Sequence, residues 1–132
     1  MKRRTIVMAV FGALALVPTV LLGLQLFGGP GWSVPVEGDP GISWMLVTDT
    51  PAYRVLRDYA EPGATRRMHH HADATWHVLT LAAGQLVLTI EGEPPVELAA
   101  GQSISLVGGV EHTFTNSGTA TATIVEVFGK QP

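Results

Sequence analysis

The 132-residue chain contains no cysteine. Disulfide bonds and thiolate metal ligands are therefore excluded, and any bound metal must be held by nitrogen and oxygen atoms. Charged residues are also few, at 14% of the chain. Because an extracytoplasmic protein is often marked by disulfides, such a location can here be inferred only from the N-terminal segment.

Basic residues are scarce beyond the N-terminus. Without Lys2, Arg3 and Arg4, the chain keeps 5 basic residues against 11 acidic ones, a net charge of −6 with neutral histidines. Arg66 and Arg67 form the one adjacent basic pair in this part of the sequence. This number of positive charges is too small for a phosphate-binding patch. Nucleic acid is therefore excluded as a partner.

No charged residue lies between Thr5 and Val36, and the sequence is apolar almost throughout as far as Phe27. This pattern predicts an N-terminal hydrophobic helix over residues 1–28, either a signal peptide or a transmembrane anchor. No small-x-small cleavage site is evident near Gly28, which favours an uncleaved anchor. The basic start predicts a periplasmic or other extracytoplasmic domain, anchored to the cytoplasmic membrane. Arg3 and Arg4 also resemble a twin-arginine export signal, with an ordinary basic signal start as the favoured alternative.

Residues 29–41 are rich in glycine and proline and predict a poorly ordered linker, so the folded domain is expected over residues 42–132. The domain sequence consists of short runs rich in Val, Ile, Leu and Thr, separated by turn residues. These runs cover residues 44–48, 53–59, 76–82, 85–91, 96–99, 103–107, 112–116 and 122–128. Short strands at this spacing predict an all-β sandwich or barrel.

All five histidines of the chain lie between His69 and His112. Imidazole is the commonest protein ligand of first-row transition metals, and residues i and i+2 of a strand share a face. A metal site that includes His69 and His71 is therefore the first hypothesis. The alternatives are a hydrogen-bonded core histidine and a solvated histidine-rich loop.

Two blocks of residues resemble the motifs of the cupin superfamily. Gly63, His69, His71 and Gly84 match the first motif, and Gly101, Gly109, His112 and Asn116 match the second at the family's spacing. The resemblance implies a cupin-type jelly-roll β-barrel, a sandwich of two sheets, over roughly residues 53–128. It also implies a small-molecule ligand or substrate and a homodimer.

The sequence departs from the family pattern at two positions. Val107 replaces a proline, and His77 stands where the family has a glutamate ligand. The resemblance therefore implies a four-histidine metal site of His69, His71, His77 and His112, with His77 beside the metal instead of on it as the alternative. Such a site suits Zn, Fe, Ni or Cu. Without the glutamate, a general base would have to be Asp73, Tyr53 or Tyr59.

Strand alternation predicts which side chains face inward. His77 is expected to point inward with Leu79 and Leu81, and His112 with Phe114 and Asn116. The same alternation turns Trp76, His70 and Glu111 outward. The competing register turns His70 inward and leaves one ligand in this stretch.

Three functions follow from the resemblance. The first is a metal-dependent enzyme, dioxygenase-like or lyase-like, that acts on a small organic molecule at a barrel mouth lined by Trp76, Tyr53, Phe114 and Met68. The second is a non-catalytic module that binds or senses a metal or small ligand. The third is a metal-free interaction scaffold, since fold does not fix function.

Overall fold

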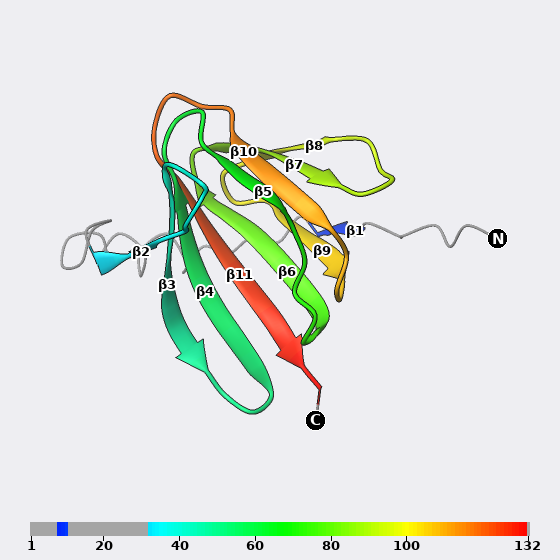
Figure 1. Ribbon diagram of the computed structural model, residues 1–132. Helices are drawn as coiled ribbons and strands as arrows, with labels where there is room; N and C mark the ends of the chain where they lie inside the picture. The colour runs from blue at the N-terminus through cyan, green and yellow to red at the C-terminus, as the bar shows by residue number, and fades with distance from the viewer. Residues whose placement is uncertain (1–7, 11–31, 132) are drawn as a thin grey trace.

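The computed structural model describes residues 8–10 and 32–131, which form two antiparallel sheets that face each other (Figure 1). The larger sheet contains, in spatial order, β1 (Met8–Val10), β9 (Ser103–Val107), β6 (Ala74–Ala83), β11 (Ala122–Lys130), β4 (Tyr53–Ala60), β3 (Ile42–Asp49) and β2 (Val34–Pro35). The smaller contains β5 (Thr65–His69), β10 (His112–Asn116), β7 (Gln85–Ile90) and β8 (Val96–Ala99). The prediction of an all-β, two-sheet fold is confirmed.

The core lies between the two sheets and is built by alternate residues of their strands. On β6, His77, Leu79 and Leu81 are buried, whereas Trp76 is 47% exposed. On β10, His112, Phe114 and Asn116 are buried in the same way. The predicted strand faces are therefore confirmed on both strands, because one face of each sheet must cover the core. The centre of the core contains Leu79, Leu81, Leu86, Leu88, Ile90, Ile104, Phe114 and Ile124.

Met8–Val10 lie within residues 1–28, for which the sequence predicts a hydrophobic helix. They form a strand that pairs with β9, so the helix prediction is wrong at these three residues. The edge of β9 would otherwise leave N–H and C=O groups unpaired, and an added strand satisfies them. The rest of the predicted signal peptide or anchor lies outside the described residues. Within residues 8–10 and 32–131, no helix has the length and apolar character needed to span a membrane.

The described part of the predicted linker packs against the sheets. Val34–Pro35 pair with β3, and Asp39 is buried. The Asp39 carboxylate accepts hydrogen bonds from Arg66 Nη1 at 2.6 Å and from the backbone N–H of Arg67 at 3.2 Å. Residues 34–39 are thus tied to β3 and β5, where the sequence predicted a poorly ordered tether. The domain boundaries themselves stay predictions.

Asn116 is buried at the end of β10 and holds the neighbouring turn. Its side-chain amide donates to the carbonyl oxygens of Ala60 and Ala120, each at 2.8 Å, and its oxygen accepts from Gly118 N–H at 2.8 Å. The bond to Ala60 joins β10 to β4 of the larger sheet, and the other two hold the turn between β10 and β11. Asn116 therefore has a structural role at this turn.

Candidate metal centre

Three histidines and one glutamate meet between the sheets. His71, His77, His112 and Glu126 each offer one donor atom, and these four atoms all lie within 4.8 Å of one another. His77, His112 and Glu126 are buried, and the side chain of His71 is largely so. Among the described residues, this is the group of side chains able to hold a metal ion.

Both sheets contribute to this group. His77 lies on β6 and Glu126 on the adjacent strand β11, while His112 begins β10 of the smaller sheet. His71 lies two residues beyond the end of β5. His69, the last residue of β5, is the register partner of His112. The group therefore spans the space between the two sheets.

The turn before β10 positions His112. Gly109 has a φ of +75°, a conformation that side-chain-bearing residues rarely adopt. At Gly108 an added Cβ would lie 2.1 Å from the carbonyl oxygen of Ala74, so only glycine allows this turn to approach the start of β6. The second motif thus brings His112 next to the strand that carries His77.

Backbone contacts orient two of the imidazole rings. His112 Nδ1 lies 2.8 Å from the carbonyl oxygen of Val110, and His69 Nδ1 lies 2.8 Å from that of Arg67. A carbonyl accepts only, so in both rings Nδ1 carries the proton and Nε2 keeps its lone pair. This is the tautomer that a metal-ligating histidine needs.

The donor atoms of the group are buried without hydrogen-bond partners. They are Nε2 of His71, His77 and His112, and Oε2 of Glu126. His77 Nε2 lies only 2.5 Å from Glu126 Oε2, and His71 Nε2 lies 4.0 Å from the same oxygen. Buried polar atoms without hydrogen-bond partners are rare because they cost free energy of folding. A cation bound between these four donor atoms would give each of them a partner. The group therefore fits a divalent metal ion.

Burial keeps the histidines neutral. It lowers the pKa of His71 from 6.5 to about 3, and the pKa of His77 and of His112 from 6.5 to about 4. Burial also lowers the pKa of His69 from 6.5 to about 4, with a further contribution from His112. All four rings are consequently neutral at pH 7, which is the form that binds a metal.

Acid is expected to destabilise the metal-free protein. Histidines with a lowered pKa in the folded state take up protons on unfolding between pH 6.5 and about 4, so the stability they contribute above pH 6.5 is lost as the pH falls. The raised pKa values of Asp58 and Glu126 act in the opposite direction, as two groups against four histidines. The free energy of unfolding should fall by on the order of 1 kcal/mol per pH unit, measured by urea denaturation at pH 7 and pH 5. An unchanged or higher midpoint at pH 5 would contradict this expectation.

Glu126 shares its environment with a second acid, Asp58 of β4. Burial and the neighbouring Glu126 raise the pKa of Asp58 well above its usual value. Burial also raises the pKa of Glu126, whereas a hydrogen bond from Asp58 opposes that rise. We therefore place the proton on Asp58, which donates to the Glu126 carboxylate. The sequence suggested Asp73, Tyr53 or Tyr59 as the general base. The structure instead places the carboxyl groups of Asp58, from β4, and Glu126, from β11, at the centre.

The remaining predicted residues lie around this centre. His69 is not among the four residues, although its ring centroid lies 4.3 Å from that of His112. Ligation by His69 stays a prediction. His70 points outward, as predicted, and pairs with Glu111 at 2.6 Å. Asp73 is 59% exposed and lies 3.3 Å from Arg54 Nη1, so it is a solvated carboxylate.

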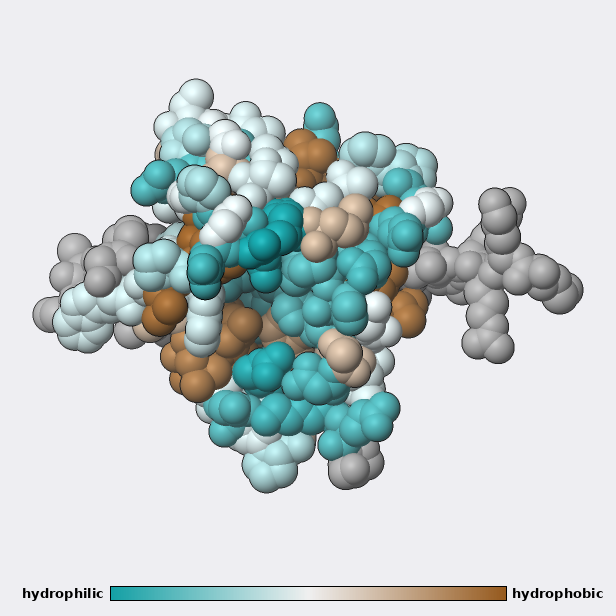
Figure 2. All heavy atoms as spheres, in the orientation of Figure 1, coloured by the Kyte–Doolittle hydropathy of each residue, from teal (hydrophilic) through white to brown (hydrophobic). Residues whose placement is uncertain are grey.

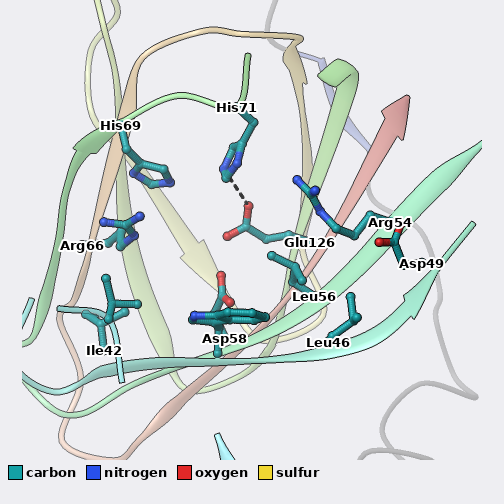
Figure 3. A pocket seen from close by; sticks show the side chains of 12 residues that line it. Ile42, Leu46, Asp49, Arg54, Leu56, Asp58, Arg66, His69, His71 and Glu126 are labelled. Carbon is teal, nitrogen blue, oxygen red and sulfur yellow. Dashed lines mark ion pairs between the residues drawn. The ribbon is translucent and has the colours of Figure 1, made fainter. Parts of the chain in front are cut away.

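A cavity of about 440 Å³ adjoins the centre. His69, His71 and Glu126 line one side of it, and apolar side chains from β3 and β4 line the other (Figure 3). Figure 2 shows hydrophobic side chains gathered over β3, where Leu46 is both exposed and part of the cavity wall. The full lining is Val36, Ile42, Trp44, Leu46, Asp49, Arg54, Leu56, Asp58, Arg66, His69, His71 and Glu126.

The mouth residues expected from the sequence do not line this cavity. Trp76 and Met68 are exposed on outward faces, and Phe114 is packed in the core. Tyr53 is exposed at the start of β4. Strand alternation accounts for the difference, because inward residues of β3 and β4 form the wall and these four residues point elsewhere.

Sequence reasoning also missed Glu126. The strand over residues 122–128 was expected, and a single charged residue in that apolar run was visible. Alternation places Glu126 on the same face as Ile124 and Phe128, both of which are buried. A charge on the inward face of a strand was the available signal, since such residues are rarely buried without a partner.

Comparison with known proteins agrees with this fold. A family model described as a cupin domain matches residues 59–128, more than half of the chain. No curated protein matches the sequence. Similar solved structures include KdgF from Halomonas sp. (18% identity, TM-score 0.63, covering 74% of this chain and 86% of that one). A second is an RmlC-like cupin from Shewanella frigidimarina (15%, TM-score 0.62, 77% and 87%).

A third is a recombinant oxalate oxidase in complex with glycolate (22% identity, TM-score 0.64), which this chain covers over only 56% of its length. At these identities the likeness is one of fold. The matched residues 59–128 contain all four residues of the candidate centre, His71, His77, His112 and Glu126. Two facing antiparallel sheets that enclose histidines, together with the match over most of the domain, show that the chain belongs to the cupin family.

Proposed function

We propose that the protein is a metal-dependent cupin in which His71, His77, His112 and Glu126 hold one divalent transition metal. The observation that carries this proposal is the set of four buried donor atoms that lack hydrogen-bond partners and lie within 4.8 Å of one another. Burying such atoms is costly unless something binds them. A scaffold without metal would gain nothing from this arrangement.

We further propose an enzyme acting on a small organic molecule. The cavity is lined by His71 and Glu126 on the side of the centre, so a molecule in it would lie next to the metal. Its size lies within the usual range for small-molecule sites. Asp58 also lines the cavity and carries a proton, so it is placed to donate or accept one during a reaction.

The types of donor atom limit which metal ions the site would bind. Three imidazoles suit Fe(II), Ni, Zn and Cu, and one carboxylate also admits Mn. When bound, such an ion acts as a Lewis acid on an oxygen atom of the substrate, and a redox-active ion adds dioxygen chemistry. We propose a dioxygenase-like or lyase-like reaction on this basis. The non-catalytic alternative is a binding or sensing module in which the four ligands close a tetrahedron.

Elemental analysis tests the metal centre. Protein purified without a histidine tag should carry about one equivalent of transition metal, and His71→Ala should lose it. His70→Ala is the matched control, because His70 is adjacent in sequence but points outward to Glu111. Chelation should also lower the melting temperature of the wild type. Equal metal content in wild type and His71→Ala would refute the centre.

If iron or another redox-active metal is found, oxygen uptake with candidate substrates tests the enzyme role.

Export remains part of the proposal and rests on the composition of residues 1–28. The charge-free apolar run behind Lys2, Arg3 and Arg4 supports a domain outside the cytoplasmic membrane. Cell fractionation of the full chain, with and without its first 28 residues, measures this directly. Recovery of the full chain in the cytosolic fraction would refute it.

A further inference from the structure

The cavity beside the candidate centre has two chemically different sides. One side consists of Ile42, Trp44, Leu46 and Leu56 from β3 and β4, which are all apolar. The other includes the guanidinium groups of Arg54 and Arg66, which flank Glu126 in Figure 3. A molecule that fits both sides must itself have an apolar body and a polar, negatively charged end.

The two arginines differ in how strongly their positive charges are paired with carboxylates of the protein. Arg66 Nη1 lies 2.6 Å from the buried carboxylate of Asp39, a close ion pair. Arg54 Nη1 meets only Asp73, at 3.3 Å, and that carboxylate is largely in solvent. An exposed pair at this distance contributes little. Arg54 is therefore the arginine whose charge remains available to a ligand.

The guanidinium group of Arg54 rests on an aromatic ring and has one nitrogen without a partner in the described part of the chain. Its guanidinium carbon lies 5.2 Å from the centroid of the Phe128 ring, so the ring supports one face of the group. Its Nε atom is buried and has no hydrogen-bond partner among the described residues. A buried N–H without a partner needs an explanation, and an anion that accepts from Nε and one Nη is the usual partner of arginine.

The acidic groups of the cavity do not meet this need. Asp49 at the rim is paired with Lys130, and Glu126 contacts His77. Asp58 is engaged with Glu126. Among the described residues, the one carboxylate that pairs with Arg54 is the largely exposed Asp73, so a ligand carboxylate in the cavity would give Arg54 a second partner that is shielded from solvent.

We propose that Arg54 binds the carboxylate of a small amphipathic organic acid whose apolar body packs against Ile42, Trp44, Leu46 and Leu56. This inference rests on the proposed function, in that it names the class of molecule that occupies the cavity next to the metal. The carboxylate lies on the Arg54 edge, and the chain or ring extends toward β3. Arg54 is thus an anion-binding residue that selects the substrate class.

Calorimetric titration with matched probes tests this assignment. Butanoate, hexanoate and octanoate vary the apolar body, and hexanamide has the shape of hexanoate without its charge. Wild type should bind hexanoate about tenfold or more tightly than hexanamide, because a charge-assisted bidentate bond is lost with the amide. Affinity should rise with chain length as more of the apolar wall is covered.

Two variants assign the effect to Arg54. Arg54→Gln should lose about tenfold or more in hexanoate affinity and leave hexanamide binding unchanged. Arg67→Gln removes the same charge from a side chain that does not line the cavity, and it should leave both affinities unchanged. Asp73→Asn should not weaken hexanoate binding, which separates ligand binding from a role for Arg54 in holding Asp73. Melting temperature and metal content confirm that each variant folds.

The outcomes separate this inference from the metal centre. A carboxylate preference that survives in Arg54→Gln but disappears on chelation would mean that the metal holds the carboxylate, which overturns the role of Arg54 and keeps the centre. If the purified protein contains no metal but still prefers hexanoate over hexanamide, and Arg54→Gln removes that preference, the anion-binding role of Arg54 is supported and the proposed metal-dependent function fails. The absence of any preference for hexanoate over hexanamide in wild type would overturn the inference outright.

Discussion

Replacing Glu126 by glutamine is expected to weaken metal binding by about 100-fold or more. Loss of a residue that only supports a ligand typically costs 10–100-fold in affinity, and Glu126 is placed to bind the ion itself. Glutamine keeps the size of the side chain but removes its charge, and its amide is a poor ligand for these metals. The measurement is a competition titration with a metal-binding indicator.

Two controls give the Glu126→Gln result its meaning. Glu97→Gln removes an exposed carboxylate from β8 and should leave the affinity unchanged. The metal-free Glu126→Gln protein should be at least as stable as the metal-free wild type, because a buried carboxylate is removed from the side of Asp58. If His69→Ala lost the metal while Glu126→Gln retained it, the site would be the four-histidine set implied by the family resemblance.

Replacing Phe128 by alanine should have the largest effect on stability, a loss of about 3–5 kcal/mol. Phe128 is fully buried on β11, and its ring stacks on His77 with centroids 4.4 Å apart. It also contacts His71, at 4.3 Å between centroids. Removing the ring leaves a cavity beside two of the proposed ligands and takes the support from the guanidinium of Arg54. Urea denaturation of the metal-free protein measures the loss.

Phe128→Leu is the matched variant, since it keeps most of the volume and removes only the aromatic ring. It should cost clearly less than the alanine variant in stability. If Phe128→Ala cost no more than Phe128→Leu, the ring would not be packed as described. Because the ring is shared by the centre and by Arg54, the alanine variant should weaken metal binding as well.

The positions of most strands could be predicted because alternation is a local property of the sequence. The runs over residues 96–99, 103–107 and 112–116 coincide with β8, β9 and β10. The inward faces followed from the same rule, as His77 and His112 demonstrate. By contrast, β5 carries Arg66 and Arg67 in a polar run, and no apolar period marks it as a strand. Its position is fixed by pairing with β10.

The candidate centre was only partly predictable. The family resemblance grouped His71, His77 and His112 from two short segments, and the structure places their donor atoms within 4.8 Å of one another. Glu126 lies 14 residues beyond His112 in sequence, and its arrival beside His77 depends on the pairing of β11 with β6. The order of strands in a sheet is set by long-range packing and cannot be predicted from a local sequence pattern. Asp58 was missed for the same reason, because β4 reaches the centre only through β11.

The four donors are not held by the same kind of segment. His77 and Glu126 stand on β6 and β11, each of which has a neighbouring strand on both sides. His71 stands beyond the end of β5, in the short connection to β6. His112 on β10 likewise has strands on both sides, so His71 is the one member of the group that a connecting segment holds. A change in the length of residues 70–73 should therefore alter the site through His71 and leave the positions of the other three donors unchanged.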